Sequence, residues 1–420
     1  MPSFQTTPGT RDILPPDAVR WRSFVEEFDA IVSLAGFQHI VVPMFEDLGV
    51  FQRLGDATDV VTKEMYDFVD KGGRHVALRP EQTAGVCRSF AQHRPLPPWK
   101  VWYSGPNFRY ERAQHGRYRQ FDQVGVEALG SDDPLLDVEV IALAVDFFQK
   151  LGLRNVVLNI NSLGDSGDRA RYVEALSQYF QARIGELSPE SVATLERNPL
   201  RVLDSKRDSE QAVVAQAPFI SGFLSDEAAS HFAQVKQGLD ALGIAYVVNE
   251  RLVRGLDYYC RTTFEFQSTA LESAQTAVGG GGRYDGLVED LGGPATPGIG
   301  FAIGLDRTLL ACDAEQVFPH PSTKADVFVI DTTGGLQALQ LCQQFRTAGF
   351  ASERAYGGRA MKAQMKAADK SGATYAVIIG TDELSQGVAT VKSMVDGYQE
   401  EIPLDSVVEH VAAQLRKVSS

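Results

Sequence analysis

The stretch "KVWYSGPNFRYERAQHGRYRQFDQVGVEALG", Lys100 to Gly130, decides the fold. Two runs rich in aromatic and apolar residues flank a charged, glycine-containing loop, roughly residues 111–117, and this pattern predicts two strands joined by that loop. The cationic residues in and beside the loop are arginines rather than lysines, and arginine binds phosphate through paired hydrogen bonds. The arginines are Arg109, Arg112, Arg117 and Arg119. The aromatic residues between them offer flat surfaces for a base. The segment is either a solvated hairpin or a nucleotide-binding clamp.

Polar residues at inward positions indicate a second candidate site. Gln123 and Glu127 are four apart on the predicted second strand, so both face the same side. Inward polar groups are costly unless they are paired, and a ligand with several donors would pair them. In "LRPEQTA", Leu78 to Ala84, Thr83 is a candidate helix N-cap. The alternative is that Glu81 and Thr83 together bind an ammonium group.

The segment "RGLDYYCRTTFEF", Arg254 to Phe266, ends as a strand, since Thr262, Phe264 and Phe266 fall on one face. The segment begins instead with Arg254, Gly255 and two tyrosines, Tyr258 and Tyr259, which are candidates for binding a ligand at the start of that strand.

Two glycine-rich segments follow, "VGGGGRYDGL" and "GIGFAIG". The first lacks the Lys-Ser/Thr of a P-loop and the second has the spacing GxGxxxG, so neither predicts a dinucleotide-binding motif. Tight turns and close backbone packing explain most of these glycines, and they leave space for a ligand beside Arg283 and Tyr284. Arg307 opens a predicted helix, where it either lies on a charged face or contacts phosphate.

The chain divides at "FPHPSTKAD", Phe318 to Asp326. Before it, strand follows strand, which favours an α+β domain with an antiparallel sheet flanked by helices, residues 1–320, with a mostly helical insertion at about 165–242. After it, strands and helices alternate, which indicates an α/β domain over residues 325–420. There, "RAMKAQMKAADK" places Arg359, Lys362, Lys366 and Lys370 along one helical face, either solvated or facing RNA.

Composition excludes several classes of protein. The 420 residues carry a net charge of −14, which counts against indiscriminate nucleic-acid binding. The N-terminus lacks the pattern of a secretory signal, and no run of about 18 apolar residues predicts a membrane span. The four cysteines are scattered and no histidine has metal-ligand spacing, so we expect a cytoplasmic protein without zinc or disulfides.

Taken together, these motifs resemble class II aminoacyl-tRNA synthetases and, within that class, the histidyl-tRNA synthetase family. "GTRDILPPDAVRW" resembles the dimer-forming first motif, residues 107–127 the second, and "PGIGFAIGLDR" the third. "RGLDYY" resembles the signature peculiar to the histidine-specific enzymes. One departure is Gln82, where many relatives are expected to have glycine.

The resemblance implies that histidine reacts with ATP, with Mg²⁺, to give histidyl-adenylate and pyrophosphate, and that the histidyl group then passes to tRNA(His). It implies no zinc, haem or nicotinamide cofactor. Arg254 and Arg109 would be the catalytic cations at the α-phosphate. The ATP-binding residues would be Arg109, Glu111, Arg117, Phe121 and Arg307. The histidine-binding residues would be Glu81, Thr83, Gln123, Glu127, Tyr258, Tyr259 and Tyr284.

The resemblance also implies a homodimer with a C-terminal anticodon-binding domain and no membrane partner. The candidate contacts to tRNA are Gln114, Arg119, Arg359, Lys362 and Lys366. An alternative is a non-catalytic, synthetase-like regulatory subunit of histidine biosynthesis, which would lack the anticodon-binding domain and carry a degraded signature. A class II synthetase for threonine, proline or glycine is a second alternative, against which the RGLDYY signature argues.

Overall fold

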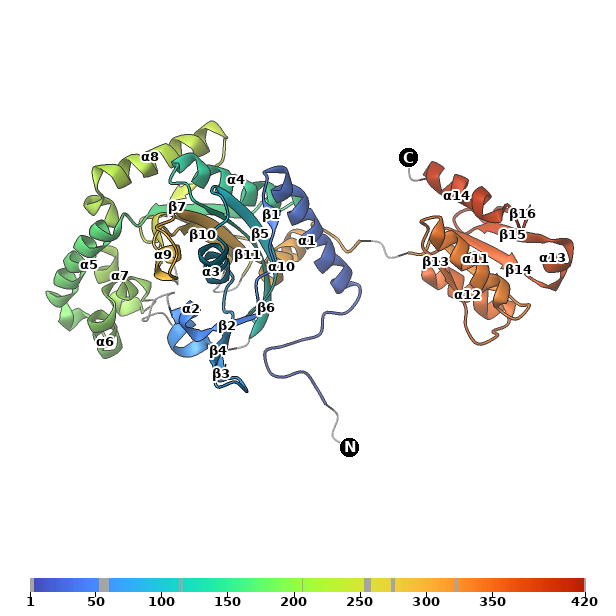
Figure 1. The fold of residues 1–420 in the computed structure, drawn as a ribbon, viewed down its shortest axis with the longest axis horizontal. Helices are drawn as coiled ribbons and strands as arrows, with labels where there is room; N and C mark the ends of the chain where they lie inside the picture. Colours follow the sequence, from blue (N-terminus) through green and yellow to red (C-terminus); the bar gives the residue numbers. More distant parts are fainter. Residues whose placement is uncertain are drawn as a thin grey trace. The chain divides into compact units, whose positions relative to one another are not determined.

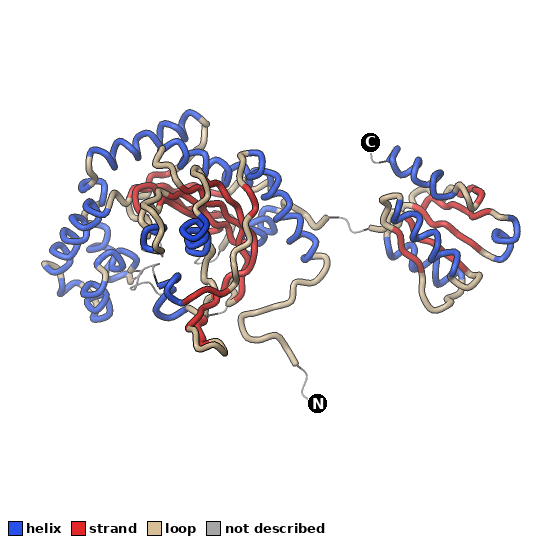
Figure 2. The backbone as a smooth tube through the Cα atoms, in the orientation of Figure 1, coloured by secondary structure: helices blue, strands red, loops and turns tan. Residues whose placement is uncertain are grey.

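A computed structural model describes residues 4–52, 60–112, 114, 116–205, 207–252, 258–272, 276–321 and 324–418. The chain forms two compact units, Met1–His320 and Pro321–Ser420 (Figure 1). Each unit has its own sheet and its own hydrophobic core (Figure 2).

The first unit is built on a large mixed sheet with the order β1-β5-β6-β11-β10-β9-β7-β8. Its long strands pair antiparallel, and the two-residue strands β1 and β8 pair parallel at the edges. The strands are β1 (Gln38–His39), β5 (Trp99–Phe108), β6 (Gln120–Leu129), β7 (Val156–Ser162), β8 (Val247–Val248), β9 (Cys260–Ser268), β10 (Ala277–Arg283) and β11 (Gly298–Gly304). The antiparallel sheet expected from the sequence is therefore confirmed, with two parallel edges added.

Four helices cover one face of this sheet and enclose the main core (Figure 1). They are α1 (Asp17–Leu34), α4 (Pro134–Lys150), α8 (Asp226–Ala241) and α10 (Leu305–Glu315). Alternate residues of each strand point into this core because side chains on a strand alternate between its faces. On β6 these are Val124, Val126 and Ala128.

The opposite face carries smaller elements and remains open between them. Helices α3 (Thr83–His93) and α9 (Leu287–Asp290) pack there around a second core. A three-stranded sheet lies nearby in the chain, with the order β2-β4-β3. Its elements and their neighbours are β2 (Phe45–Asp47), α2 (Leu48–Gln52), a π-helix (Val60–Glu64), β3 (Tyr66–Val69) and β4 (His75–Leu78).

The expected helical insertion is present between β7 and β8 and has its own apolar cluster. Its elements before α8 are α5 (Ser166–Gln181), α6 (Pro189–Arg197), α7 (Gln211–Ala215) and the 3₁₀ turns Ile184–Glu186, Pro199–Asp204, Asp208–Glu210 and Ile220–Phe223. A buried ion pair ties α4 to the large sheet, since Arg283 on β10 binds Asp137, which also accepts a hydrogen bond from His231 on α8 at 2.9 Å.

The second unit is the expected α/β fold, a five-stranded sheet with the order β13-β12-β14-β15-β16. Its strands are β12 (Val327–Asp331), β13 (Ser352–Arg354), β14 (Tyr375–Ile379), β15 (Val388–Ser393) and β16 (Gln399–Pro403). Its helices are α11 (Leu336–Thr347), α12 (Met361–Ser371), α13 (Thr381–Gln386) and α14 (Val407–Val418).

The basic stripe on α12 differs from its prediction at one position. Lys362, Lys366 and Lys370 are exposed along the helix, but Arg359 precedes it, and Ala360 is the residue at its N-cap. The prediction was wrong there because helical spacing was extended beyond the helix start.

Of the helices that the structure describes, none combines the length and the apolar character that crossing a bilayer requires.

Candidate active site

On the open face of the large sheet, β10 and β11 present mostly glycine, so this part of the face has few side chains. On β11, Ile299, Phe301 and Ile303 point into the core. The alternate positions are Gly298, Gly300, Ala302 and Gly304, so the other face of this strand is nearly bare. Four consecutive glycines, residues 279–282, occupy the neighbouring β10. Two adjoining cavities lie over these strands.

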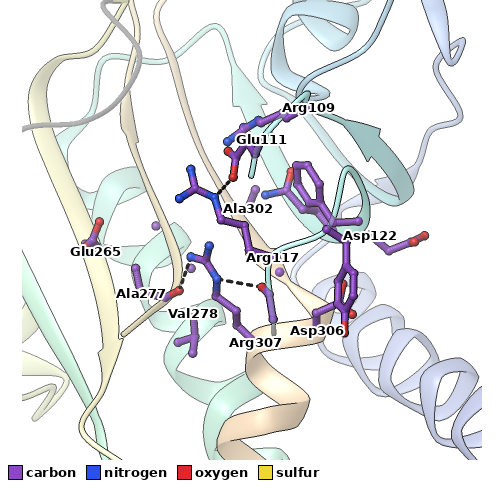
Figure 3. A pocket seen from close by; sticks show the side chains of 17 residues that line it. Arg109, Glu111, Arg117, Asp122, Glu265, Ala277, Val278, Ala302, Asp306 and Arg307 are labelled. Carbon is purple, nitrogen blue, oxygen red and sulfur yellow. Dashed lines mark hydrogen bonds and ion pairs between the residues drawn. The ribbon is translucent and has the colours of Figure 1, made fainter. Parts of the chain in front are cut away.

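Three arginines line the larger cavity, which has a volume of about 270 Å³ (Figure 3). Arg109 follows β5, Arg117 comes from the loop after it, and Arg307 lies in the first turn of α10. Arg307 donates to the carbonyl oxygens of Gly116 at 3.3 Å and Ala277 at 3.2 Å. Burial and the neighbouring Arg117 and Arg109 lower the pKa of Arg307. Because the cationic groups oppose one another, a bound anion would stabilise all three.

Two of the predicted nucleotide-binding residues are already paired with these arginines. Glu111 forms an ion pair with Arg117, which Figure 3 shows within the cavity. The guanidinium carbon of Arg109 lies 5.2 Å from the ring centre of Phe121. The structure thus brings the described members of the predicted ATP set, Arg109, Glu111, Arg117, Phe121 and Arg307, to one cavity.

Carboxylates that the sequence analysis missed also line this cavity. Burial, with the nearby Asp306, raises the pKa of Asp122 to about 6. Burial raises the pKa of Asp306 as well, against the lowering effect of Arg11. Glu265 is the third. A signal for Glu265 was available, because it alternates with Phe264 and Phe266 and must therefore face away from the core.

The smaller cavity, of about 80 Å³, shares Arg109, Gln123, Gly280 and Ala302 with the larger one. Its polar side chains include the described members of the predicted histidine set. They are Glu81, Thr83, Gln123, Glu127, Tyr258, Tyr259 and Tyr284, together with Tyr103, which the sequence analysis did not single out. Gln123 accepts a hydrogen bond from Asn107 at 2.8 Å, which orients its amide.

Glu127 is the centre of the smaller cavity. Its Oε1 accepts hydrogen bonds from Thr83 Oγ1 at 2.7 Å and Tyr103 Oη at 3.1 Å, and the Tyr284 hydroxyl donates to Oε2. Burial raises the pKa of Glu127 to about 8, although the three hydroxyl donors act in the opposite direction. A Cβ atom at Gly300 would collide with Oε2, so glycine is required there.

The start of α3 differs from the N-cap prediction. Glu81, not Thr83, satisfies the helix terminus, accepting from the backbone N–H groups of Thr83 at 2.6 Å and Ala84 at 2.9 Å. Thr83 is the first helical residue and its hydroxyl goes to Glu127 instead. Of the two interpretations of Thr83 that the sequence left open, the helix N-cap is therefore wrong. Gln82 occupies the N-cap position, and its amide donates to the Gly105 carbonyl at 3.4 Å.

The tyrosines of the smaller cavity, Tyr258, Tyr259 and Tyr284, pack against one another. The ring centres of Tyr258 and Tyr259 are 4.6 Å apart, and Tyr258 meets Tyr284 edge-on at 5.7 Å. Burial raises the pKa values of Tyr258 and Tyr284 well above the usual range, so both remain neutral phenols that can donate.

The remaining predicted site residues lie elsewhere. Arg254 falls outside the described residues. Arg119 packs over the Tyr110 ring at 3.9 Å and its Nε donates to the Glu111 carbonyl, while Gln114 bridges to Arg117 within the same loop. Arg359, Lys362 and Lys366 belong to the second unit.

Comparisons with known proteins agree with this geometry. A family model described as histidyl-tRNA synthetase matches residues 9–308. The chain belongs to this histidyl-tRNA synthetase family. A second model, an anticodon-binding domain, matches residues 326–414. The resemblance seen in the sequence motifs is thereby confirmed.

Individual members of the histidyl-tRNA synthetase family are similar over the full length. The histidine–tRNA ligase of Geobacillus kaustophilus is 46% identical, covering 99% of each chain. That of Rhodococcus erythropolis is 48% identical, covering 97% of each. The crystal structure of the apo histidyl-tRNA synthetase of S. aureus superposes with a TM-score of 0.83 at 38% identity, covering 98% of this chain and 100% of that one. The class II synthetase type of fold is therefore confirmed.

The raised pKa of Glu127 predicts a pH-dependent stability. Its folded pKa of about 8 exceeds the ordinary value of 4.5, so the folded protein binds the extra proton between these limits. The stabilisation that this proton gives to the folded protein is complete below pH 4.5 and is lost as the pH rises through 8. Glu127→Gln should therefore gain stability relative to the wild type by up to about 1.4 kcal/mol for each pH unit between 5 and 8.

Urea unfolding of both proteins at several pH values measures this difference. Glu26→Gln, at an exposed site on α1, is the matched control and should give a flat difference. A flat difference for Glu127→Gln as well would contradict the assigned pKa.

Proposed function

We propose that this protein is a histidine–tRNA ligase whose two adjoining cavities align ATP with histidine. The carboxylate of histidine attacks the α-phosphorus of ATP, the bond to the bridging oxygen breaks, and pyrophosphate leaves. The terminal adenosine hydroxyl of tRNA(His) then attacks the histidyl carbonyl, and AMP leaves. The observation that carries the proposal is that Arg109 and Gln123 line both cavities, so the two substrates would meet beside them.

The larger cavity suits ATP. Arg109 would hold the α-phosphate and Phe121 would stack on adenine, whose amino group Glu111 would accept. Arg117 and Arg307 would bind the outer phosphates. This proposal is supported by their shared cavity and by the lowered pKa of Arg307, which burial and the neighbouring Arg117 and Arg109 cause and which a bound phosphate would counteract. Fixed cations stabilise the charge that accumulates in phosphoryl transfer without reorganisation. Arg254 would supply a further cation to the α-phosphate, and this assignment rests on the family signature RGLDYY.

The smaller cavity suits histidine. Glu81, Thr83 and Gln123 would take the α-amino group. Both oxygens of Glu81 already accept a backbone N–H, but each carboxylate oxygen has a second lone pair available. Glu127 and the tyrosines, Tyr258, Tyr259 and Tyr284, would surround the imidazole and pair with its ring nitrogens.

We propose that Mg²⁺ enters the larger cavity together with ATP. Glu265 and Asp306 line it, and burial raises the pKa of Asp306, which a divalent cation would counteract. Magnesium prefers carboxylate oxygens together with substrate phosphates. Asp306 is paired with Arg11, and the described residues bring no group of three or more such ligands together, so the ion would be held mainly by the phosphates of ATP, whose charge it would neutralise.

Contacts to tRNA are proposed from the family resemblance; four of the five candidate side chains are exposed and the fifth, Arg119, is partly buried. Gln114 and Arg119 would meet the acceptor end, and Arg359, Lys362 and Lys366 would face the anticodon side. We further propose that the enzyme works in the cytoplasm.

The regulatory-subunit alternative is less supported. Such a subunit would lack the anticodon-binding domain, and residues 326–414 match that domain. The polar lining of the smaller cavity is also intact in the described residues.

The proposed reaction predicts histidine-dependent exchange of labelled pyrophosphate into ATP by the purified chain with magnesium. The other amino acids, including threonine, proline and glycine, should support no exchange above background. Folded protein that is silent with histidine would contradict the proposal.

Two substitutions should separate the two substrate sites. Arg254→Ala should slow adenylation by orders of magnitude with histidine affinity nearly unchanged, as expected for a contact made in the transition state. Glu127→Ala should weaken histidine binding first. Single-turnover rates and histidine titrations measure both, with Arg197→Ala on the insertion as a neutral control. A collapse of histidine affinity in Arg254→Ala would refute the assigned role.

A homodimer is supported by exposed apolar side chains between the end of α1 and β2. Leu34, Val41, Met44 and Phe45 are each more than half exposed. Analytical ultracentrifugation should give twice the 45.9 kDa of one chain. Val41→Glu with Phe45→Glu should reduce it to the mass of one chain, and Leu242→Glu, at an exposed site on the insertion, should not. A wild-type protein that sediments as a monomer would rule this interface out.

A further inference from the structure

Tyr103 is a buried tyrosine of β5 that the histidine-binding set described above does not include. Its side chain is 1% exposed and lines the smaller cavity. Its partner across the strands is Gly125, where a Cβ atom would approach the phenol carbon and oxygen to 2.5 Å. The glycine therefore makes room for a full tyrosine, including its hydroxyl.

The hydroxyl of Tyr103 donates to Glu127 Oε1, to which Thr83 also donates. A carboxylate oxygen has two acceptor positions, so Oε1 is filled. Oε2 accepts from Tyr284 and keeps one position. Oε2 of Glu127 can therefore accept one additional hydrogen bond, whereas Oε1 can accept none.

We propose that Tyr103 is a positioning residue for histidine recognition: with Thr83 it fills Oε1 of Glu127, so that a single acceptor position on Oε2 is left for one N–H of the substrate imidazole. The inference rests on the proposed function and names a residue that selects the substrate through Glu127. Tyr103 does not act on the reacting atoms.

The arrangement also controls the charge of Glu127. A buried carboxylate loses its hydration and binds a proton unless donors compensate. The titratable groups that face Glu127 come from α3 and the turn before it, from β5 and its end, from the segment before β9, and from the end of β10. They are Glu81, Cys87, Tyr103, Arg109, Tyr258, Tyr259 and Tyr284.

Loss of the Tyr103 hydroxyl should therefore favour protonated Glu127. Burial raises the pKa of Glu127 to about 8 and the Tyr103 hydrogen bond acts against it. Removing a hydrogen bond to an ionised group should raise this pKa further, by about one pH unit. An imidazole N–H needs the ionised carboxylate as its acceptor, so histidine binding should weaken wherever Glu127 is protonated.

Tyr103→Phe tests this, because it keeps the ring and removes the hydroxyl. Histidine-dependent pyrophosphate exchange is measured from pH 6.5 to 9.5 for the variant and the wild type. At pH 7 the histidine KM should rise roughly tenfold while kcat stays within about twofold. The ratio of the two kcat/KM values should approach one near pH 9.5, where both carboxylates are ionised. Titrations of histidine itself affect both enzymes alike and cancel in this ratio.

Tyr172→Phe is the matched control. Tyr172 lies in the insertion, is 2% exposed and donates one hydrogen bond of 3.1 Å, to the Pro218 carbonyl. Thermal unfolding compares the structural cost of the two substitutions, and Tyr172→Phe should leave the pH profile of exchange unchanged. Thr83→Val removes the other donor to Oε1 and should displace the acidic limb in the same direction, which provides a second test if Tyr103→Phe folds poorly.

A Tyr103→Phe enzyme with the wild-type profile, a loss of equal size at every pH, or a fall in kcat alone would each overturn the proposal. Wild-type exchange with histidine is recorded in the same experiment. Its failure would contradict the proposed function, whereas its success with an unchanged variant would contradict the role of Tyr103 alone.

Discussion

The candidate site depends on a strip of sheet that carries almost no side chains. On β11, glycine and alanine alternate with isoleucine and phenylalanine, so that one face of the strand builds the core and the other is bare. Large polar groups from neighbouring elements lie flat on that bare face, among them the Glu127 carboxylate against Gly300 and the Tyr284 ring against Gly298. Since a Cβ at either glycine would occupy their space, the positions of Glu127 and Tyr284 in the smaller cavity follow from this steric constraint.

Charge is divided between the two cavities. Three guanidinium groups line the larger one beside four carboxylates, and two carboxylates with phenol and hydroxyl donors line the smaller one. Burial strengthens each interaction, because water no longer screens it. The same burial penalises the charged form of each group, so the pKa values of Arg307 and Glu127 are both displaced toward the neutral form. Under the proposed function, a phosphate of ATP would stabilise the charged form of Arg307 and an N–H of histidine that of Glu127.

The scaffold behind the site is held by buried polar contacts as well as by apolar packing. Arg283, at the end of β10, is buried against Asp137 of α4, and the next residue is Tyr284, which reaches Glu127 on the opposite face. A buried ion pair is weak evidence for net stability, but loss of one partner leaves an uncompensated charge. The pair therefore fixes where β10 ends and where the Tyr284 hydroxyl lies.

The amino-acid sequence by itself determined the strand–loop–strand of residues 100–130, the helical insertion and the separate α/β unit, because period-two patterns and short motifs are local properties. Through its resemblance to a family it also indicated most of the polar side chains that line the two cavities. Only the tertiary structure decided which groups pair. Glu127 meets Thr83 and Tyr284 across 44 and 157 residues of chain, and Glu81 replaces Thr83 as the partner of the helix terminus. The sequence analysis missed Tyr103 and Asp306 because an isolated tyrosine or aspartate carries no local signal of function. Hydrogen-bond partners depend on distances through space, and those are set when the strands come together in register.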